Sequence, residues 1–258
     1  MLLASYLKGA LSGRRNRRLK TEFDFKRNAE RPFANRADAG RKLAIKLVAY
    51  AKSPNLLVLA LPRGGVLIAY EIARALHAPL DICLVHKLGV PGNEELAIGA
   101  IASGGVRVLN PEAMGWSDLS SSIIDAVIKR EQKELERREH LYRGNRSALD
   151  IQGRTVILVD DGLATGATMR AAAIALRRKK PTMIVAAVPV APPETCEAFR
   201  SEVEEVICGI TPEPFIAVGA WYSDFSQTTD EEVQQLLEQA WQNRRGNSPT
   251  AEPIGEVR

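Results

Sequence analysis

The sequence has few cysteines, and their spacing excludes the sites that cysteines usually build. Its 258 residues include three, Cys83, Cys196 and Cys208, with no Cys-x-x-Cys pair among them. An odd number without such spacing argues against zinc ligation and against disulfides. Cys83 and Cys208 lie in apolar runs, so we expect them to be small core residues. This cysteine usage predicts a reducing compartment, the cytoplasm.

Long apolar runs are absent as well. No run reaches the roughly 18 residues that a helix needs to cross a bilayer, so we expect no membrane-spanning segment. Aromatic residues make up only 5% of the chain, and the net charge is a mild +4. This charge suits a small polyanionic substrate as well as nucleic acid and excludes neither. The length allows one α/β domain of about 200 residues with extensions.

One stretch, residues 156–168, carries more chemical information than the rest of the chain. It reads Val-Ile-Leu-Val-Asp-Asp-Gly-Leu-Ala-Thr-Gly-Ala-Thr. The four apolar residues predict a fully buried strand, and the Ala-rich run that follows predicts a helix. Asp160 and Asp161 fall where the strand ends, which is the edge at which open α/β sheets bind ligands.

The residue types after this strand suit a phosphorylated sugar. The backbone N–H groups of Thr165 to Thr168 would be unpaired at the helix start and would bind an anion, most naturally a phosphate. The two carboxylates can only accept hydrogen bonds, so their natural partners are hydroxyls or a metal. A phosphate beside a diol describes a ribose 5-phosphate. The alternative is an ordinary turn with two solvated acids.

The stretch resembles the signature of the type I phosphoribosyltransferases: an apolar strand, two acids, then Ala-Thr-Gly-x-Thr. The similarity extends from about Arg36 to about Asn243. The resemblance implies an α/β fold with a mostly parallel open sheet, helices on both faces, a small hood subdomain and a flexible loop. It also implies an enzyme of pentosyl transfer, which moves 5-phosphoribosyl from 5-phosphoribosyl 1-pyrophosphate (PRPP) to a nitrogenous base with Mg²⁺ and releases pyrophosphate.

The resemblance implies a role for each part of the motif. Asp160 and Asp161 would bind the ribose hydroxyls, directly or through Mg²⁺. The 5-phosphate would be held by a loop of five residues, namely Ala164, Thr165, Gly166, Ala167 and Thr168.

A second loop follows the strand predicted over 56–60. It contains Arg63, Gly64 and Gly65 and leads into a helix through about Leu76. Two glycines let the backbone approach a ligand closely. In the family this is the pyrophosphate loop, whose peptide bond is sometimes cis without proline; an ordinary βα turn is the alternative. Lys87, after a strand predicted over 80–85, has the place of a pyrophosphate-binding lysine, with a solvated lysine as the alternative.

Two further segments match parts of the family. Residues 96–102 and 106–109 predict a hairpin around Ser103-Gly104-Gly105, where the family has its flexible loop. Residues 215–225 are unusually aromatic and match the hood that holds the base. Of Trp221, Tyr222 and Phe225, we take Tyr222 as the candidate substrate-binding residue, with packing at the rim of the core as the alternative.

The remaining segments complete the predicted domain. We expect strands over 182–190 and 203–208, and helices over 119–142 and 195–201. Asn35 predicts an N-cap, and Thr229 with Glu232 predicts a capping box for a last helix ending near Asn243. The charged helix over 119–142, capped by Ser117-Asp118, has a solvated face, with a dimer edge as the alternative.

The domain organisation follows from composition. We expect a flexible basic arm over 1–34, a phosphoribosyltransferase-like domain over 35–243 and a disordered tail over 244–258. A homodimer is expected. A weak nucleic-acid or membrane-surface contact by the arm is the less favoured alternative.

The acceptor base and the role are less constrained than the fold. Family members that use 6-oxopurines carry an acid where this chain has Ala164, which disfavours hypoxanthine, guanine and xanthine. The alternative to an enzyme is a non-catalytic regulator of the same fold that senses PRPP or a nucleotide. A phosphohydrolase is disfavoured because the carboxylates and histidines of such sites are missing.

Overall fold

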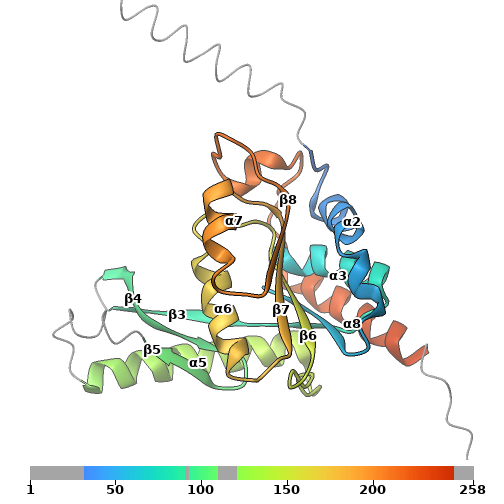
Figure 1. Ribbon diagram of the computed structural model, residues 1–258. Helices are drawn as coiled ribbons and strands as arrows, with labels where there is room; N and C mark the ends of the chain where they lie inside the picture. Colours follow the sequence, from blue (N-terminus) through green and yellow to red (C-terminus); the bar gives the residue numbers. More distant parts are fainter. Residues whose placement is uncertain (1–31, 91–92, 110–120, 247–258) are drawn as a thin grey trace, which may run out of the picture. The chain divides into compact units, whose positions relative to one another are not determined.

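A computed structural model describes residues 32–90, 93–109 and 121–246, and its helices and strands lie within the unit Phe33–Arg258. The main sheet has five parallel strands in the order β2-β1-β6-β7-β8 (Figure 1). In chain order these are β1 (Leu56–Ala60), β2 (Leu80–Ile82), β6 (Thr155–Val159), β7 (Met183–Val190) and β8 (Glu205–Ile210). The predicted α/β fold with a mostly parallel sheet is confirmed.

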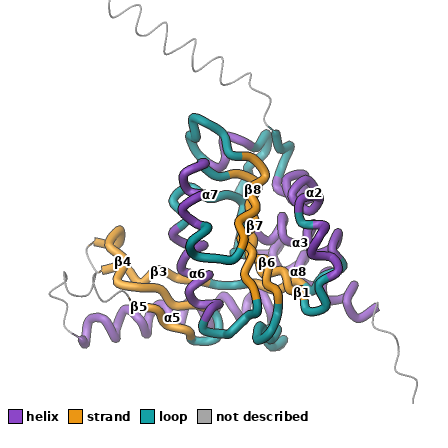
Figure 2. The backbone as a smooth tube through the Cα atoms, in the orientation of Figure 1, coloured by secondary structure: helices purple, strands orange, loops and turns teal. Residues whose placement is uncertain are grey.

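Helices cover both faces of this sheet (Figures 1 and 2). One face carries α2 (Arg36–Lys46), α3 (Gly64–Leu76) and α8 (Asp230–Gly246). The other carries α6 (Ala167–Arg177) and α7 (Pro193–Phe199). Two short 3₁₀ helices, η1 (Val48–Lys52) and η2 (Val218–Trp221), complete the described helices together with α5 (Ser121–Arg143).

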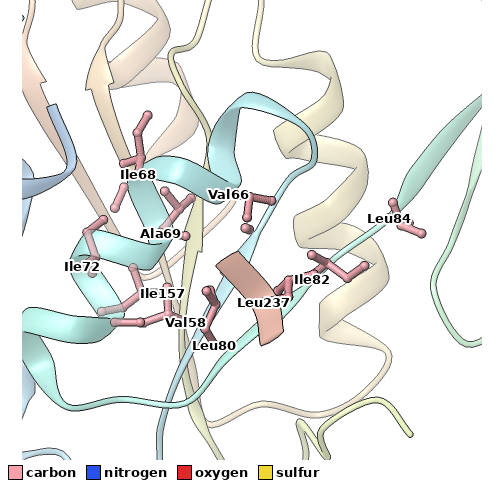
Figure 3. Packing of buried hydrophobic residues seen from close by; sticks show 14 of the residues in the cluster. Val58, Val66, Ile68, Ala69, Ile72, Leu80, Ile82, Leu84, Ile157 and Leu237 are labelled. Carbon is pink, nitrogen blue, oxygen red and sulfur yellow. The ribbon is translucent and has the colours of Figure 1, made fainter. Parts of the chain in front are cut away.

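The core explains why the central strands are apolar at every position. Alternate residues of one strand point to opposite faces, and here both faces are covered. Val58 and Ile157 pack under α3, whereas Leu57 and Leu158 pack under α6. Figure 3 shows the hydrophobic cluster on the α3 face, to which Leu237 of α8 also belongs.

The chain also forms a second, separate sheet, whose three strands are antiparallel. It consists of β3 (Val85–Val90), β4 (Asn93–Ala102) and β5 (Val106–Leu109), with α5 alongside (Figures 1 and 2). The predicted hairpin is confirmed, and Gly104 and Gly105 take φ values of +78° and +74° in its turn. Glycine adopts this left-handed region without steric penalty.

The single strand predicted over 80–85 is wrong, because this apolar run serves two sheets. The N–H of Cys83 still donates to Ala60 of β1 at 2.8 Å, whereas Leu84 exchanges hydrogen bonds with Ser103 of the hairpin. Each half therefore has a different partner, and β3 runs on from Val85 to Val90. An unbroken apolar run cannot reveal such a change of partner.

Helix ends follow their predicted signals. Asn35 caps α2 by accepting from the N–H of Asp38 at 2.9 Å. Thr229 and Glu232 form the predicted capping box, with reciprocal hydrogen bonds of 2.8 and 3.1 Å. Helix α7 and strand β8 each lie about two residues from their predicted ranges.

The prediction that the cysteines form no disulfide is wrong. The structure joins Cys196 of α7 to Cys208 of β8, while Cys83 is free and buried as predicted. The two bonded cysteines come from an adjoining helix and strand, and their spacing along the chain gives no sign of this proximity.

Several predictions fall wholly or largely outside the described residues, namely the cap Ser117-Asp118, residues 1–31 of the arm predicted over 1–34, and residues 247–258 of the tail predicted over 244–258. Residues 244–246 belong to α8 instead of the predicted tail. Among the residues that are described, no helix combines the length and apolar character that crossing a bilayer requires.

Candidate active site

Two loops begin side by side at the carboxyl ends of β1 and β6. Ala60 and Val159 are paired in register, and the N–H of Leu61 donates to the carbonyl of Val159 at 2.9 Å. The loop with the glycines and the loop with the acids therefore share one edge of the sheet. This is the edge at which parallel sheets bind ligands.

The glycine loop lies against the backbone of the acid loop. A Cβ on Gly65 would be 2.7 Å from the carbonyl oxygen of Val159, so only glycine fits there without a shift of backbone. The peptide bond between Pro62 and Arg63 is cis, as the family resemblance suggested. Helix α3 starts at Gly64, which places its first N–H groups at this edge.

The two acids are held differently. Asp160 accepts one hydrogen bond through Oδ1, from the backbone N–H of Asp161 at 2.8 Å. Oδ2 of Asp161 accepts two from Arg36, from Nε at 2.9 Å and from a terminal nitrogen at 2.8 Å. Burial raises the pKa of both carboxyls, and the charge of Asp161 raises the pKa of Asp160 further. Arg36 opposes the shift at Asp161.

The sequence did not single out Arg36, which the structure places beside the acids. It is the first residue of α2, and its side chain is almost fully buried although it is charged. The positive end of the helix dipole disfavours a cation at this position. An arginine there was the available signal that an acid from elsewhere in the chain pairs with it.

The loop that follows the acids, residues 163–168 (the anion loop), has backbone N–H groups without a hydrogen-bond partner among the described residues. Leu163 is fixed to Val190 of β7 by a 2.9 Å hydrogen bond, and Thr195 donates to the carbonyl of Ala164 at 3.0 Å. Gly166, with a φ of +73°, turns the chain into α6. None of the hydrogen bonds recorded for the described residues uses the N–H groups of 165–168. This arrangement fits the predicted anion site.

Arg63 belongs to the glycine loop, and its side chain lies near the start of α8. Its guanidinium is 3.9 Å from Oδ1 of Asp230, and this oxygen also accepts from the hydroxyl of Tyr142 at 2.5 Å. About a third of the Arg63 side chain remains exposed. Lys87 lies on β3 opposite Ala100 with an exposed side chain, and its role stays a prediction.

The predicted role of Tyr222 is wrong, because its ring is in the core. Tyr222 is 0% exposed and packs between Phe33 and Phe225, with ring centroids at 5.3 and 5.0 Å. Its hydroxyl donates to the backbone carbonyl of Asp161 at 2.7 Å. Tyr222 therefore holds the acid loop and offers no face to a flat ligand.

Gly64→Ala is expected to displace the carboxylate of Asp161. The new Cβ would lie 2.1 Å from Oδ2 of Asp161 and 2.8 Å from Nε of Arg36, where no methyl group fits. We expect the free energy of unfolding to fall by about 1–3 kcal/mol, as for other overpacked sites. Urea unfolding measures this. In G64A/D161A the main clash is gone, so the double variant should be no less stable than D161A; strictly additive losses would contradict the clash.

Comparison with known proteins identifies the family. The model of the phosphoribosyl transferase domain matches residues 33–220. The chain belongs to the phosphoribosyl transferase domain family. The matched range of this domain includes Arg36, the glycine loop, both acids and the anion loop.

Relatives agree with this assignment. A Mycobacterium tuberculosis protein named "Putative phosphoribosyl transferase Rv0571c" is 44% identical over 208 residues, 81% of this chain and 47% of its own length. The chain therefore spans about half the length of the curated relatives it matches. The crystal structure of TT1426 from Thermus thermophilus is 42% identical and covers 80% of this chain and 98% of its own, with a TM-score of 0.72.

Proposed function

We propose that this phosphoribosyl transferase domain moves the 5-phosphoribosyl group of PRPP to a nitrogenous base and releases pyrophosphate. The observation that carries the proposal is the shared edge at which the acids, the open N–H groups of 165–168 and the Arg63-Gly64-Gly65 loop meet. Three anionic or hydroxylic parts of one donor, the 5-phosphate, the diol and the pyrophosphate, correspond to these three groups.

The carboxylates suit a magnesium ion that arrives with the donor. Among the described residues no group of three or more His, Cys, Asp or Glu side chains could hold a metal by itself. Mg²⁺ typically binds through one or two carboxylates together with substrate phosphates, and Asp160 and Asp161 supply such carboxylates. When bound, the ion would act as a Lewis acid and as a template for the pyrophosphate and ribose oxygens.

The chain's own contribution is positioning and charge. Carbon 1 of the ribose becomes cation-like as pyrophosphate leaves, so groups that hold the sugar and stabilise the departing charge favour the reaction. The acids would orient the diol, and the loop over 164–168 would fix the 5-phosphate. Arg63 and the backbone of Gly64 and Gly65 would hold the pyrophosphate, with Lys87 as a second cation.

The acceptor is proposed to lie outside the 6-oxopurines. Ala164 supplies no carboxylate beside the anion loop, so a proton on such a purine has no acid partner at this position. The family's Asp at this place is the basis of that inference.

A panel assay tests the proposal. The protein is incubated with PRPP, Mg²⁺ and a set of purine and pyrimidine bases, and pyrophosphate release is followed. We expect release with at least one base, and none with the D160N protein. Release with no base, together with nucleic-acid binding that is lost on deleting residues 1–34, would favour the regulator instead.

A further inference from the structure

Arg36 uses its whole guanidinium group for contacts within the protein. Two nitrogens donate to Oδ2 of Asp161, and the third donates to the carbonyl of Ser226 at 2.7 Å. Its flat face stacks on Phe225 at 3.8 Å from the ring centroid. The residue is 8% exposed, so these bonds form away from water, where charge-assisted hydrogen bonds are strong.

The same contacts occupy Oδ2 of Asp161, whose side chain is 20% exposed. This oxygen also lies 2.1 Å from the position that a Cβ on Gly64 would take. The backbone carbonyl of Asp161 accepts from Tyr222. Asp161 thus links α2, through Arg36, to the segment that carries Tyr222, and its negative charge is paired with a cation inside the protein.

Asp160 makes no ion pair with any of the described residues. Its only recorded partner among the described residues is the N–H of Asp161, which bonds to Oδ1. Oδ2 therefore keeps its capacity to accept a hydrogen bond or to bind a cation. The two neighbouring acids, alike in sequence, have different surroundings.

We infer that Arg36 is a positioning residue that serves as the fixed cation of Asp161, so that Asp160 is the carboxylate that contacts the ribose and its metal. The inference rests on the proposed function and divides the acidic pair into a ligand-binding member, Asp160, and a member that is paired with Arg36, Asp161. Arginine suits this task better than lysine because its planar fork makes several fixed hydrogen bonds at once.

Donor binding by matched variants tests the inference. Calorimetry with PRPP and Mg²⁺, well below each melting temperature, compares the wild type with D160N, D161N, R36M and R36K. We expect D160N to lose about 100-fold or more in affinity and D161N about fivefold, because Asn still accepts from Arg36. R36M is expected to lose about 10- to 100-fold, as is typical for residues that orient a ligand-binding group.

Two controls separate positioning from folding. R36K should bind better than R36M, and R36M/D161N should bind better than R36M, because it removes the unpaired charge. Arg41→Met changes an exposed arginine five residues farther along α2, paired with Glu71, and should bind as the wild type does. An arginine with a purely structural role would lower the melting temperature and leave the affinity of the folded protein unchanged.

The possible outcomes distinguish a failure of this inference from a failure of the proposed function. If the wild type binds no PRPP, the proposed function fails and the inference fails with it. If the wild type binds PRPP but D161N loses as much affinity as D160N, or R36M binds normally, only the division of the acids is overturned.

Discussion

Asp160→Asn is expected to abolish measurable donor binding while leaving the domain folded. Asparagine keeps the hydrogen bond from the N–H of Asp161 to Oδ1. It removes the charge that would attract a cation, and it replaces Oδ2, the acceptor that would receive a ribose hydroxyl, with an NH2 donor. A loss of at least about 100-fold in affinity corresponds to roughly 2.8 kcal/mol. Calorimetry with PRPP and Mg²⁺ measures it.

The same substitution is expected not to lower the melting temperature. Burial and the charge of Asp161 raise the pKa of Asp160, which means that the ionised carboxylate is less stable in the fold than in water. Replacing it by a neutral amide removes this penalty at neutral pH. Asp150→Asn, a change at an exposed acid that accepts from the nearby N–H of Gln152, serves as the control. Affinity within a few-fold of the wild type would refute the assignment of Asp160.

Arg143→Met is expected to give the largest loss of stability. Arg143 and Asp81 are 5% and 1% exposed, and Nε of Arg143 donates to Oδ1 of Asp81 at 2.9 Å. Arg143 also donates to the carbonyl of Ile82 at 2.8 Å, which ties the end of α5 to β2. Methionine would leave the carboxylate buried without its cation. Breaking a buried pair in this way costs about 3–5 kcal/mol.

Thermal unfolding measures this loss, with an expected fall of about 10 °C for a domain of this size. Arg137→Met provides the control, because Arg137 lies on the same helix and its bonds to Glu134 are exposed. Exposed pairs contribute about 0–1 kcal/mol, so its melting temperature should barely change. Equal effects of the two substitutions would show that the buried pair does not stabilise the fold.

Local signals predicted the parts of the fold that depend on neighbours in sequence. The strands at 56–60 and 156–159, the hairpin turn at Ser103–Gly105 and the capping box at Thr229 each depend on residues within a few positions. The motif around Asp160 and the glycine loop also lie where predicted, because both follow buried parallel strands that pair in register.

The features that escaped prediction depend on distant partners. Arg36 meets Asp161 across 125 residues, and nothing near Arg36 indicates which acid it pairs with. The apolar segment around Cys83 passes from the main sheet to the antiparallel sheet, because the N–H of Leu84 donates to the hydroxyl of Ser103. Tyr222 has an aromatic ring that could stack on a base, but Phe33 and Phe225 enclose this ring in the core. Tertiary packing decides these cases.

The contacts of Arg36 bear on how the domain is made. Its two hydrogen-bonding partners, Asp161 and Ser226, follow it by 125 and 190 residues. During synthesis on a ribosome, Arg36 emerges long before either partner exists, so the acid loop can reach its final arrangement only when nearly the whole domain has been released. Shortened versions that end before Ser226 would lack one side of this arrangement, and gene fusions that preserve the site should keep the segment from Arg36 to Ser226 intact.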